Sequence, residues 1–579
     1  YVSDNFDLNS DGYLDDDEIS AVTSIDIHDI DTYYDHKAVQ YVDGVELFTN
    51  LTSIDCSGQG IRSMDIQNLT KLKYLDVSNN MMSDLTLPSK ADDLIYLDIS
   101  GNNITRLTSL ADYDNLTHLD ASGTNLEEIN VKRMKGLTYL GVSGLSLKTL
   151  DLSENQQLDT VYCRAMSGLS TLDLSNHTTL KNVYCDAGSL NIAGSITKLD
   201  VSGDTALETL NCSANNLSEL NITNTPKLSI LNCANTKLDS LDVTNNKALT
   251  SLTVDGTALG SLNVSNNTAL TSLSAAEADL TEMDITKLSS LSYVNLDGND
   301  LTSIDVSKNT ALDTLTVSDN KLESINLTNN KNLRVLEVNK NRLVCIDIST
   351  CPKLLNSDEG GSFSCTGNSR DITLDKPNYD LDLTAYNTKY GFHKAYASSD
   401  IKTWNEKKQA YELGRKNTTI GYAGLALGED NGMTYEVTGG AINNYHLTAN
   451  LDSTEIKYKY FCGIGTRTVD FTLNILNPLG VVVWYSLDDG VHSAGDSTLK
   501  FVVGSTTTLT AKDRSGNAHE NITWSSNNNK VAAINSKTGE LTCKAGGTAQ
   551  ITTNLNGRPV GYINIECHNP VNKMSFIDR

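Results

Sequence analysis

Leucine recurs along most of this chain in the pattern L-x-x-L-x-V, in which apolar and other positions alternate over a short segment. The pattern returns every 21 or 22 residues, with one interval of 27, and the interval is a constant 21 from Leu207 onward. A fixed period of this length predicts a solenoid, in which each repeat stacks on its neighbours to bury a continuous core. The fourteen repeats start at Leu51, Leu72, Leu94, Leu116, Leu137, Leu158, Leu180, Leu207, Leu228, Leu249, Leu270, Leu291, Leu312 and Leu333.

One unit, residues 249–269, reads LTSLTVDGTALGSLNVSNNTA and resembles the leucine-rich repeat pattern LxxLxLxxNxLxxL. The resemblance implies a leucine-rich repeat solenoid. With the two β-sandwich domains predicted below from the residues after the repeats, we expect a mainly β fold with minor α structure. Asparagine at the ninth position can satisfy backbone groups where the chain turns away from the strand. It occurs at Asn80, Asn102, Asn215, Asn299, Asn320 and Asn341.

Each unit contains two similar half-patterns, and we expect the first half to line the concave face. After the first half the next leucine follows the Asn-like position by two residues, as the repeat pattern requires, whereas after the second half it follows by three. Side chains alternate between the two faces of a strand. Positions 4 and 6 should therefore point into the core, and positions 3, 5 and 7 should face the concave surface.

Aromatic and acidic residues gather at these concave positions in the first half of the array, whereas later coils carry mostly Ser, Thr, Asn and Ala. Rings combined with carboxylates offer amphipathic contact area and directional acceptors, as in protein interfaces and sugar-binding platforms. The alternative to a binding role is that Asp before Val belongs to the general repeat pattern, because LDV and LDL also occur in the second half. The predicted ligand-binding residues are Tyr74, Tyr96, His118 and Tyr139 at position 3, and Asp76, Asp98, Asp120, Tyr162 and Tyr184 at position 5.

The stretch FDLNSDGYLDDDEI near the start resembles the calcium loop of an EF-hand. Such a loop supplies hard oxygens from alternating side chains, one backbone carbonyl and a bidentate final Glu, and Gly12 permits its sharp turn. Only six residues precede Asp7, too few for a full entering helix, so we expect a structural Ca2+ rather than a sensor. A turn without metal is the other reading. The predicted ligands are Asp7, Asn9, Asp11, Tyr13 through its carbonyl, Asp15 and Glu18.

Residues 1–50 precede the first repeat, and we expect them to form a cap because the ends of a stacked array need covering. After the acidic run DDDE, Ile19, Val22 and Ile25 follow the spacing of a short amphipathic helix. The solenoid is assigned to residues 51–365, since the period stops past Leu354 and GGSFSCTGNSR reads as a Gly/Ser-rich exit.

Residues 366–478 contain alternating runs such as TEIKYKYF and VDFTLNIL, which predict short antiparallel strands in an Ig-like β-sandwich. Small all-β domains close leucine-rich arrays in bacterial surface proteins such as internalins, and this organisation is similar. Residues 479–579 resemble the bacterial immunoglobulin-like group 2 domain. That family resemblance implies a spacer or stalk on a bacterial surface protein. It is carried by Trp524-Ser525-Ser526, Val531-Ala532, Gly539 and Gly546-Gly547-Thr548.

Four of the eleven cysteines occupy repeat position 6 and are predicted to form a buried ladder of free thiols. They are Cys163, Cys185, Cys212 and Cys233. One disulfide among Cys345, Cys351 and Cys365 at the solenoid exit is left open, and so is a Cys543–Cys567 pair, because connectivity cannot be read from sequence.

The formal charge of −27 repels phosphate backbones and anionic membranes, so we expect no nucleic-acid partner. No run of eighteen apolar residues and no signal-peptide pattern occur in the chain, so we expect no membrane insertion by it. Motifs for a nucleophile elbow, a P-loop, a dinucleotide site or a zincin helix are absent, so we expect no enzyme.

These features favour a non-enzymatic bacterial protein, secreted or held at the cell surface, that acts as an adhesin. Its concave face would recognise an extracellular protein or glycan of a host or neighbouring microbe, and we expect a monomer. The alternative is an architectural spacer of a surface or matrix, without a dedicated ligand. Clustered exposed aromatic residues on the concave face would favour binding, and a uniform Ser/Thr/Asn surface would favour the spacer.

Overall fold

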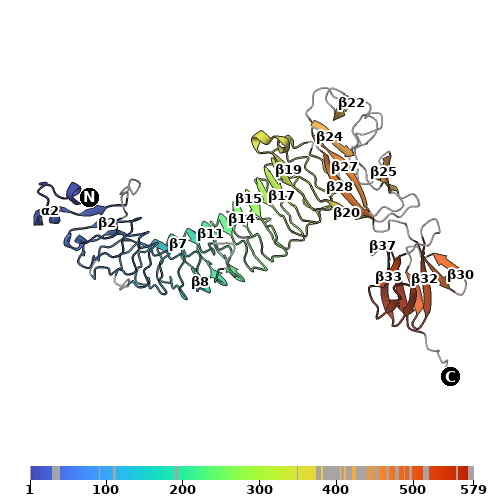
Figure 1. Ribbon diagram of the computed structural model, residues 1–579, viewed down its shortest axis with the longest axis horizontal. Helices are drawn as coiled ribbons and strands as arrows, with labels where there is room; N and C mark the ends of the chain where they lie inside the picture. Colours follow the sequence, from blue (N-terminus) through green and yellow to red (C-terminus); the bar gives the residue numbers. More distant parts are fainter. Residues whose placement is uncertain are drawn as a thin grey trace, which may run out of the picture. The chain divides into compact units, whose positions relative to one another are not determined.

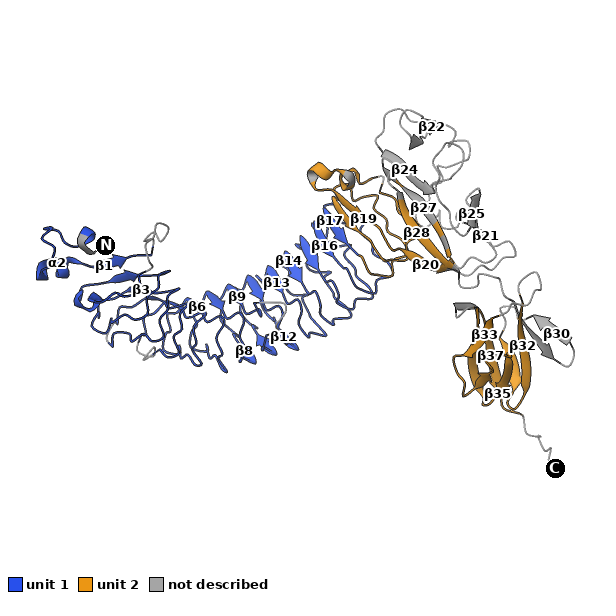
Figure 2. Ribbon diagram, viewed as in Figure 1, with its two compact units in different colours: residues 1–317 blue, residues 318–579 orange. Residues whose placement is uncertain are grey.

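The computed structural model describes residues 2–570 except 29–38, 90–91, 108–112, 189–193, 349, 513–520 and 556–557; within 373–497 it describes the strands alone. The chain divides into two compact units, residues 1–317 and residues 318–579 (Figure 2). None of the helices in this described part of the chain has the length and apolar character to cross a membrane.

The amino-terminal segment combines two short helices with the first strand of the main sheet. Helix α1 covers Val2–Asn5, helix α2 covers Asp16–Ala21, strand β1 covers Ser24–Asp26, and the 3-10 helix η1 covers Val45–Leu47. Asp15 and Glu18 form a capping box at the start of α2. The expected helix is therefore shorter than the pattern suggested: it ends at Ala21, and Ile25 lies in β1, where it pairs with Ile54.

Sixteen strands form one long parallel sheet, which confirms the repeat-based prediction of the fold. Its fourteen central strands each begin two residues after a predicted repeat start, so every first half-pattern contributes one strand. In spatial order they are β2 (Ser53–Asp55), β3 (Tyr74–Asp76), β4 (Tyr96–Asp98), β5 (His118–Asp120), β6 (Tyr139–Gly141), β7 (Thr160–Tyr162), β9 (Asn182–Tyr184), β11 (Thr209–Asn211), β13 (Ile230–Asn232), β14 (Ser251–Thr253), β15 (Ser272–Ser274), β16 (Tyr293–Asn295), β17 (Thr314–Thr316) and β18 (Val335–Glu337).

Within residues 1–317 this sheet lines the inner side of a curved array, as Figure 1 shows. Three second half-patterns form a separate parallel sheet on the outer side, with strands β8 (Thr171–Asp173), β10 (Lys198–Asp200) and β12 (Glu219–Asn221). The first half-pattern therefore faces the concave side, as predicted.

Burial alternates along the strands of the long sheet, as expected for a face that packs on one side only. Leu75 and Val77, at positions 4 and 6 of one coil, are fully buried, and Tyr74 at position 3 is half-buried. The ninth-position asparagines are also buried. The Asn80 amide donates to the Cys56 carbonyl at 2.8 Å, and its oxygen accepts from the Ile61 N–H at 2.9 Å. Each such residue therefore links the backbones of neighbouring coils.

The four predicted ladder cysteines are buried and free, as the repeat register required. Burial raises the pKa of Cys212 well above its ordinary value, and a contact with Cys163 and burial do the same for Cys185. Cys345, Cys351 and Cys365 are likewise buried thiols, so the disulfide left open at the solenoid exit does not form.

The solenoid exit is a further coil rather than a plain linker. Strand β19 (Ser362–Ser364) extends the long sheet beside β18, and the 3-10 helices η3 (Pro352–Leu355) and η4 (Ser357–Glu359) precede it. Phe363 is buried, and the Asn368 amide donates to the Val338 carbonyl at 3.0 Å, as the other ladder asparagines do. The stretch SFSCTGN, residues 362–368, has this register in the sequence, but Gly360, Gly361 and Gly367 obscured it.

Strands from the segment 366–478 form three small sheets. Most pairings are antiparallel as predicted, but β20 pairs in parallel with β28, so the expectation of a wholly antiparallel domain is wrong for β20. The strands are β20 (Ser369–Ile372), β21 (Asp380–Asp382), β22 (Trp404–Asn405), β23 (Ala410–Tyr411), β24 (Ile420–Leu425), β25 (Gly440–Asn443), β26 (His446–Ala449), β27 (Glu455–Ile464) and β28 (Thr468–Ile475).

The last strands form two sheets around a shared core that includes Leu509, Trp524 and Ile551. Cys543 and Cys567 are joined by a disulfide, which settles the second pairing left open by the sequence. Gly539 has a positive φ of +71°, and a side chain there would collide with the Leu509 carbonyl and the Trp524 ring. The strands are β29 (Val482–Leu487), β30 (Gly490–Ser493), β31 (Leu499–Val502), β32 (Thr506–Lys512), β33 (Ile522–Ser526), β34 (Ala532–Ile534), β35 (Glu540–Cys543), β36 (Gly547–Leu555) and β37 (Arg558–His568).

A second ladder of buried polar residues runs through the second half-patterns, and it contains one acid. Asn155 and Asn267 each donate to two carbonyls of the preceding coil. Asp204 occupies the equivalent place, fully buried; its Oδ1 accepts from the His177 N–H at 2.8 Å, and its Oδ2 has no hydrogen-bond partner. Burial raises the pKa of Asp204 to about 8, so this carboxyl holds a proton in the folded protein at neutral pH.

We predict that Asp204→Asn changes how stability depends on pH. The unfolded chain releases this proton above about pH 4, but the folded chain keeps it up to about pH 8, so wild-type stability falls as pH rises between these values. An amide is neutral throughout, so the stability of the variant relative to wild type should rise by about 3–4 kcal/mol between pH 5 and pH 8. Urea unfolding at pH 5 and pH 8 measures how the free energy of unfolding changes with pH in wild type and in the variant. An equal change in the two proteins would contradict the assignment of a buried, protonated Asp204.

Candidate functional site

Six rings on the concave face form one continuous column across six neighbouring strands. Tyr74, Tyr96, His118 and Tyr139 stack almost parallel, with centroids 4.3, 4.2 and 4.1 Å apart. Tyr139 meets Tyr162 at 5.7 Å in a tilted contact, and Tyr162 stacks on Tyr184 at 4.7 Å. The structure therefore brings all six predicted ring positions together. We call these six residues the aromatic column.

Stacking determines which part of each ring a ligand can reach. The in-register pairing of Tyr74 with Tyr96 and of Tyr96 with His118 places equivalent side chains one strand apart, close to the spacing at which rings stack. The flat faces of the inner rings are covered by their neighbours. The ring edges and the tyrosine hydroxyls remain for a partner.

Burial keeps three members of the aromatic column uncharged near neutral pH. Burial raises the pKa of Tyr96 and of Tyr139 well above the usual range, so both hydroxyls keep their protons. Burial lowers the pKa of His118, which favours the neutral imidazole. All six side chains are half-buried, so they contribute to packing and remain accessible at the surface.

A column of aspartates runs beside the rings at position 5. In-register pairing aligns Asp55, Asp76, Asp98 and Asp120 on consecutive strands, with Asp26 of β1 before them. Burial, together with the charges of the neighbouring Asp120 and Asp76, raises the pKa of Asp98 to about 6. These five residues, called the aspartate column here, concentrate negative charge on this face.

The predicted Asp76, Asp98 and Asp120 differ in exposure but share one local geometry. Asp76 is 9% exposed, whereas the other two are half-buried. In each case Oδ1 accepts the backbone N–H of the serine two residues later, at 3.0, 2.8 and 2.8 Å. This turn explains why Asp is common here, and it leaves Oδ2 for other contacts.

The two columns meet at Gly141. The Asp120 carboxylate occupies the space that a side chain at Gly141 would need, and Tyr139 donates its hydroxyl to Asp120 Oδ2 at 3.1 Å. From the next strand onward the rings of Tyr162 and Tyr184 stand at position 5 instead of position 3. Glycine at this point therefore lets the aromatic column cross the face without a break.

One basic side chain that the sequence reasoning missed lies on the same face. Arg164, at position 7 of the Tyr162 coil, makes two bonds to Asp186, at 2.9 and 3.1 Å. Asn211 also donates to Asp186, at 3.1 Å. The spacing of 22 residues between Arg164 and Asp186, one repeat, could have indicated this pair.

The predicted calcium loop folds back on itself through its own side chains. Gly12 and Asp11 donate their N–H groups to the two oxygens of Asp7, at 2.9 and 3.2 Å. Glu18 is buried, and its carboxylate accepts from the N–H groups of Leu8 and Asp15 at 2.8 and 3.1 Å. The donor set consists of hard oxygens, so it fits calcium in kind.

Among the described residues, the titratable side chains that come close enough to share a metal ion lie elsewhere, at Asp26, His28 and Asp55. His28 Nδ1 is 2.5 Å from Asp26 Oδ1 and 4.0 Å from Asp55 Oδ2. A hydrogen bond from His28 lowers the pKa of Asp26. The imidazole therefore faces the first two members of the aspartate column.

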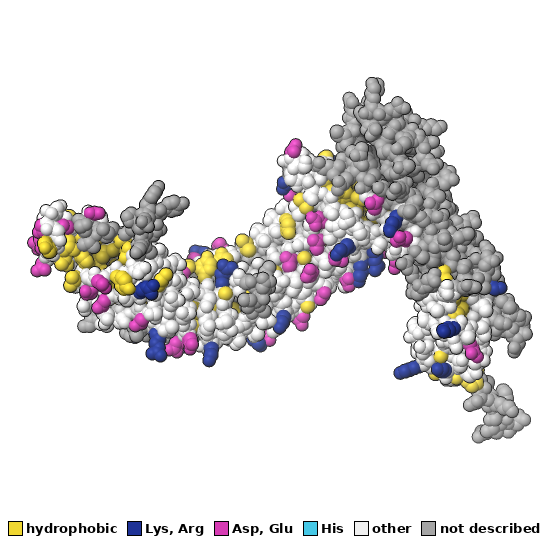
Figure 3. All heavy atoms as spheres, viewed as in Figure 1, with side chains coloured by type: hydrophobic (Ala, Val, Ile, Leu, Met, Phe, Trp, Pro, Cys, Tyr) yellow, Lys and Arg dark blue, Asp and Glu magenta, His cyan; other side chains and the backbone are white. Residues whose placement is uncertain are grey.

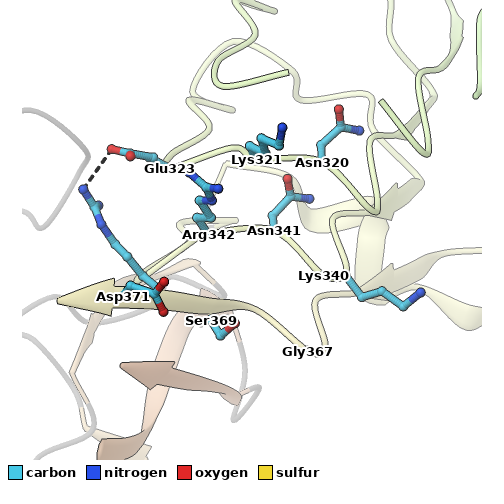
Figure 4. A pocket seen from close by; sticks show the side chains of 10 residues that line it. Asn320, Lys321, Glu323, Lys340, Asn341, Arg342, Gly367, Ser369 and Asp371 are labelled. Carbon is cyan, nitrogen blue, oxygen red and sulfur yellow. Dashed lines mark hydrogen bonds and ion pairs between the residues drawn. The ribbon is translucent and has the colours of Figure 1, made fainter. Parts of the chain in front are cut away.

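A polar pocket of about 510 Å3 lies within the second unit (Figure 4). Arg370 pairs with Glu323 at 2.9 Å there, and Lys340 pairs with Asp319 at 3.0 Å. The aromatic column is the stronger candidate site, because the chain's own carboxylates already neutralise two basic residues of the pocket. The lining residues are Asn320, Lys321, Glu323, Lys340, Asn341, Arg342, Gly367, Ser369, Arg370 and Asp371.

Comparison with known proteins supports the fold of both parts of the chain. Residues 496–556 match the family of bacterial Ig-like domains (group 2). The functional domain of InlJ from Listeria monocytogenes, which includes a cysteine ladder, is 24% identical with a TM-score of 0.56, and the match covers 74% of this chain and 92% of that domain. At this identity the likeness establishes the solenoid fold alone.

More distant structures give a weaker match. The internalin InlF from Listeria monocytogenes is 18% identical over 55% of this chain and 88% of its own, with a TM-score of 0.43. YopM from Yersinia enterocolitica is 23% identical over 51% of this chain and 57% of its own, with a TM-score of 0.38. No curated protein matches the chain by sequence.

Proposed function

We propose that this chain is a non-enzymatic binding protein of the bacterial surface or the secreted fraction, and that it recognises an extracellular partner through its concave face. The aromatic column is the observation that carries the proposal. Half-buried rings held by stacking lose little freedom on binding, and tyrosine is enriched among the residues that dominate interface energies. Such an array of rings has no obvious use in a plain spacer.

The surroundings of the aromatic column support the same proposal. In Figure 3 acidic side chains rim the amino-terminal end of the first unit, next to hydrophobic ones. Several later strands of the sheet present small polar residues at position 3, such as Ser251, Ser272 and Thr314, although Ile230 and Tyr293 are exposed at that position on two others. The contrast between the two halves of one sheet favours a local site over a uniform surface.

An extracellular location is part of this proposal. The Cys543–Cys567 disulfide suits an oxidising environment, since structural disulfides are rare in the reducing cytosol. The match to a bacterial Ig-like domain is consistent with presentation outside the cell. If the rings do not contribute to binding in the experiment below, the result would favour an architectural spacer instead.

We further propose that calcium binds at the amino-terminal loop in a structural role. Asp7, Asn9, Asp11, Asp15 and Glu18 would supply side-chain oxygens, and Tyr13 its carbonyl. The hydrogen bonds from Gly12 to Asp7 and from Tyr13 to Asp11 orient two of these carboxylates within the loop. The bound ion would offset their mutual repulsion and hold the entry to α2.

Truncating two rings should weaken binding without unfolding the chain. For a partner obtained from an extracellular protein and glycan screen, we expect Tyr96→Ala with Tyr139→Ala to cost on the order of 2 kcal/mol of affinity per ring. Loss of stacking should cost only about 0.5–1.5 kcal/mol of stability per ring pair. Titration calorimetry and urea unfolding measure the two quantities.

The matched control removes side chains from the later strands of the same face, in Thr253→Ala with Thr316→Ala. This control should bind like the wild type. Equal affinity of wild type, ring variant and control would reject the aromatic column as the binding site and would favour the architectural spacer.

Removal of calcium should destabilise the amino-terminal segment. At a hundredfold excess of free calcium over Kd, binding to the folded state adds about 2.7 kcal/mol. Chelation should therefore lower the melting temperature and increase proteolysis within residues 1–28. Asp11→Asn keeps an oxygen for the Tyr13 N–H but removes a charge, so it should respond less to calcium. Unchanged melting and proteolysis, with no ion uptake on titration, would refute the site.

A further inference from the structure

The aspartate column contains a run of three carboxylates, Asp76, Asp98 and Asp120, that form no ion pair with a Lys or Arg of the described residues. The two earlier members of the column face His28. In-register carboxylates on parallel strands stand about 4.8 Å apart, close enough to repel one another.

The same face already shows how it pairs with a cation. Three strands beyond the aspartate column, Asp186 is 8% exposed in its side chain and receives two hydrogen bonds from the guanidinium of Arg164. That carboxylate is neutralised by the chain itself. Asp76, Asp98 and Asp120 stand on the same face, and no guanidinium or ammonium group of the described residues pairs with them.

The stacking of the aromatic column also limits the chemical class of the partner. A sugar usually binds an aromatic residue by laying its C–H groups on the flat face of the ring. The inner faces between Tyr74 and Tyr139 are occupied by neighbouring rings 4.1 to 4.3 Å away. What remains is a row of edges and hydroxyls, which suits apolar side chains and backbone amides of a polypeptide.

We infer that the partner of this face is a basic polypeptide segment, whose Arg or Lys side chains pair with Asp76, Asp98 and Asp120 while its remaining atoms lie along the ring edges. The inference rests on the proposed function of the concave face and names the chemical class of its ligand. Charge complementarity also accounts for discrimination, because an acidic glycan or nucleic acid would meet the aspartates with like charge.

The test uses an octa-arginine peptide and two charge-matched variants of the full chain. The first is Asp76→Asn, Asp98→Asn, Asp120→Asn. The control is Asp242→Asn, Asp284→Asn, Asp305→Asn, in which each aspartate lies in a second half-pattern and also accepts the backbone N–H two residues later. Both remove three charges and keep an oxygen for the turn, and urea unfolding checks that both remain folded.

We expect the concave variant to bind octa-arginine about ten-fold more weakly than wild type, because three ion pairs are lost, and the control to change less than about two-fold. Equal weakening of the two variants would mean that the peptide responds to net charge alone and would overturn the inference. Maltohexaose binding that is lost in Tyr96→Ala would overturn it as well.

A partner isolated by the extracellular screen separates this inference from the proposed function. Affinity that falls both in the ring variant and in the concave aspartate variant supports the two together. Dependence on Tyr96 and Tyr139 without dependence on the three aspartates would overturn the basic partner and leave the binding face in place. Dependence on neither would overturn both.

Discussion

The stacking of coils in strict register is the constraint on which this structure depends. A single coil is too small to bury its leucines, so each must lie against the next. Backbone pairing between strands and buried asparagine amides hold that contact, as when Asn80 and Asn102 reach carbonyls of the preceding coil. Because these bonds link equivalent atoms, each coil repeats the position of its neighbour.

The register of the strands also determines how side chains are arranged on the concave surface. A residue type that recurs at one position must form a column at the spacing of the strands, whatever its chemistry. Aromatic rings at that spacing stack, and aspartates at that spacing repel. The first effect gives a rigid neutral ridge, and the second gives a row of carboxylates that favours cations. The candidate site is thus a consequence of the same geometry that builds the core.

The repeat period was sufficient to predict the coils, the inward leucines and the buried cysteines, because each follows from position within the repeat. The orientation of the rings was not predictable, since spacing along the chain places Tyr96 and His118 on adjacent strands but does not fix their planes. The last coil was missed because glycines in 359–367 interrupt the pattern, although Phe363 and Asn368 keep the register. Ile25 was assigned to a helix because its spacing suits either element, and pairing with Ile54 decides for a strand.

The cap and the two β domains have no sequence period, so their strand and disulfide pairings are set by contacts between residues far apart in the sequence. Cys543 and Cys567 are 24 residues apart, and only the fold of the last domain brings them together. The parallel pairing of β20 with β28 likewise joins segments about a hundred residues apart in sequence, as Arg370 opposite Leu473 illustrates. Neither pairing follows from the local pattern of apolar residues.

Hydroxyl-radical footprinting of the chain in complex with its partner is the most direct measurement of the central claim. The account predicts that oxidation of Tyr96 and Tyr139 falls on binding, whereas Tyr293, which is 39% exposed on a later strand of the same sheet, is oxidised as before. Protection confined to Tyr293 or to Tyr562 in the last domain, with the aromatic column unchanged, would contradict it.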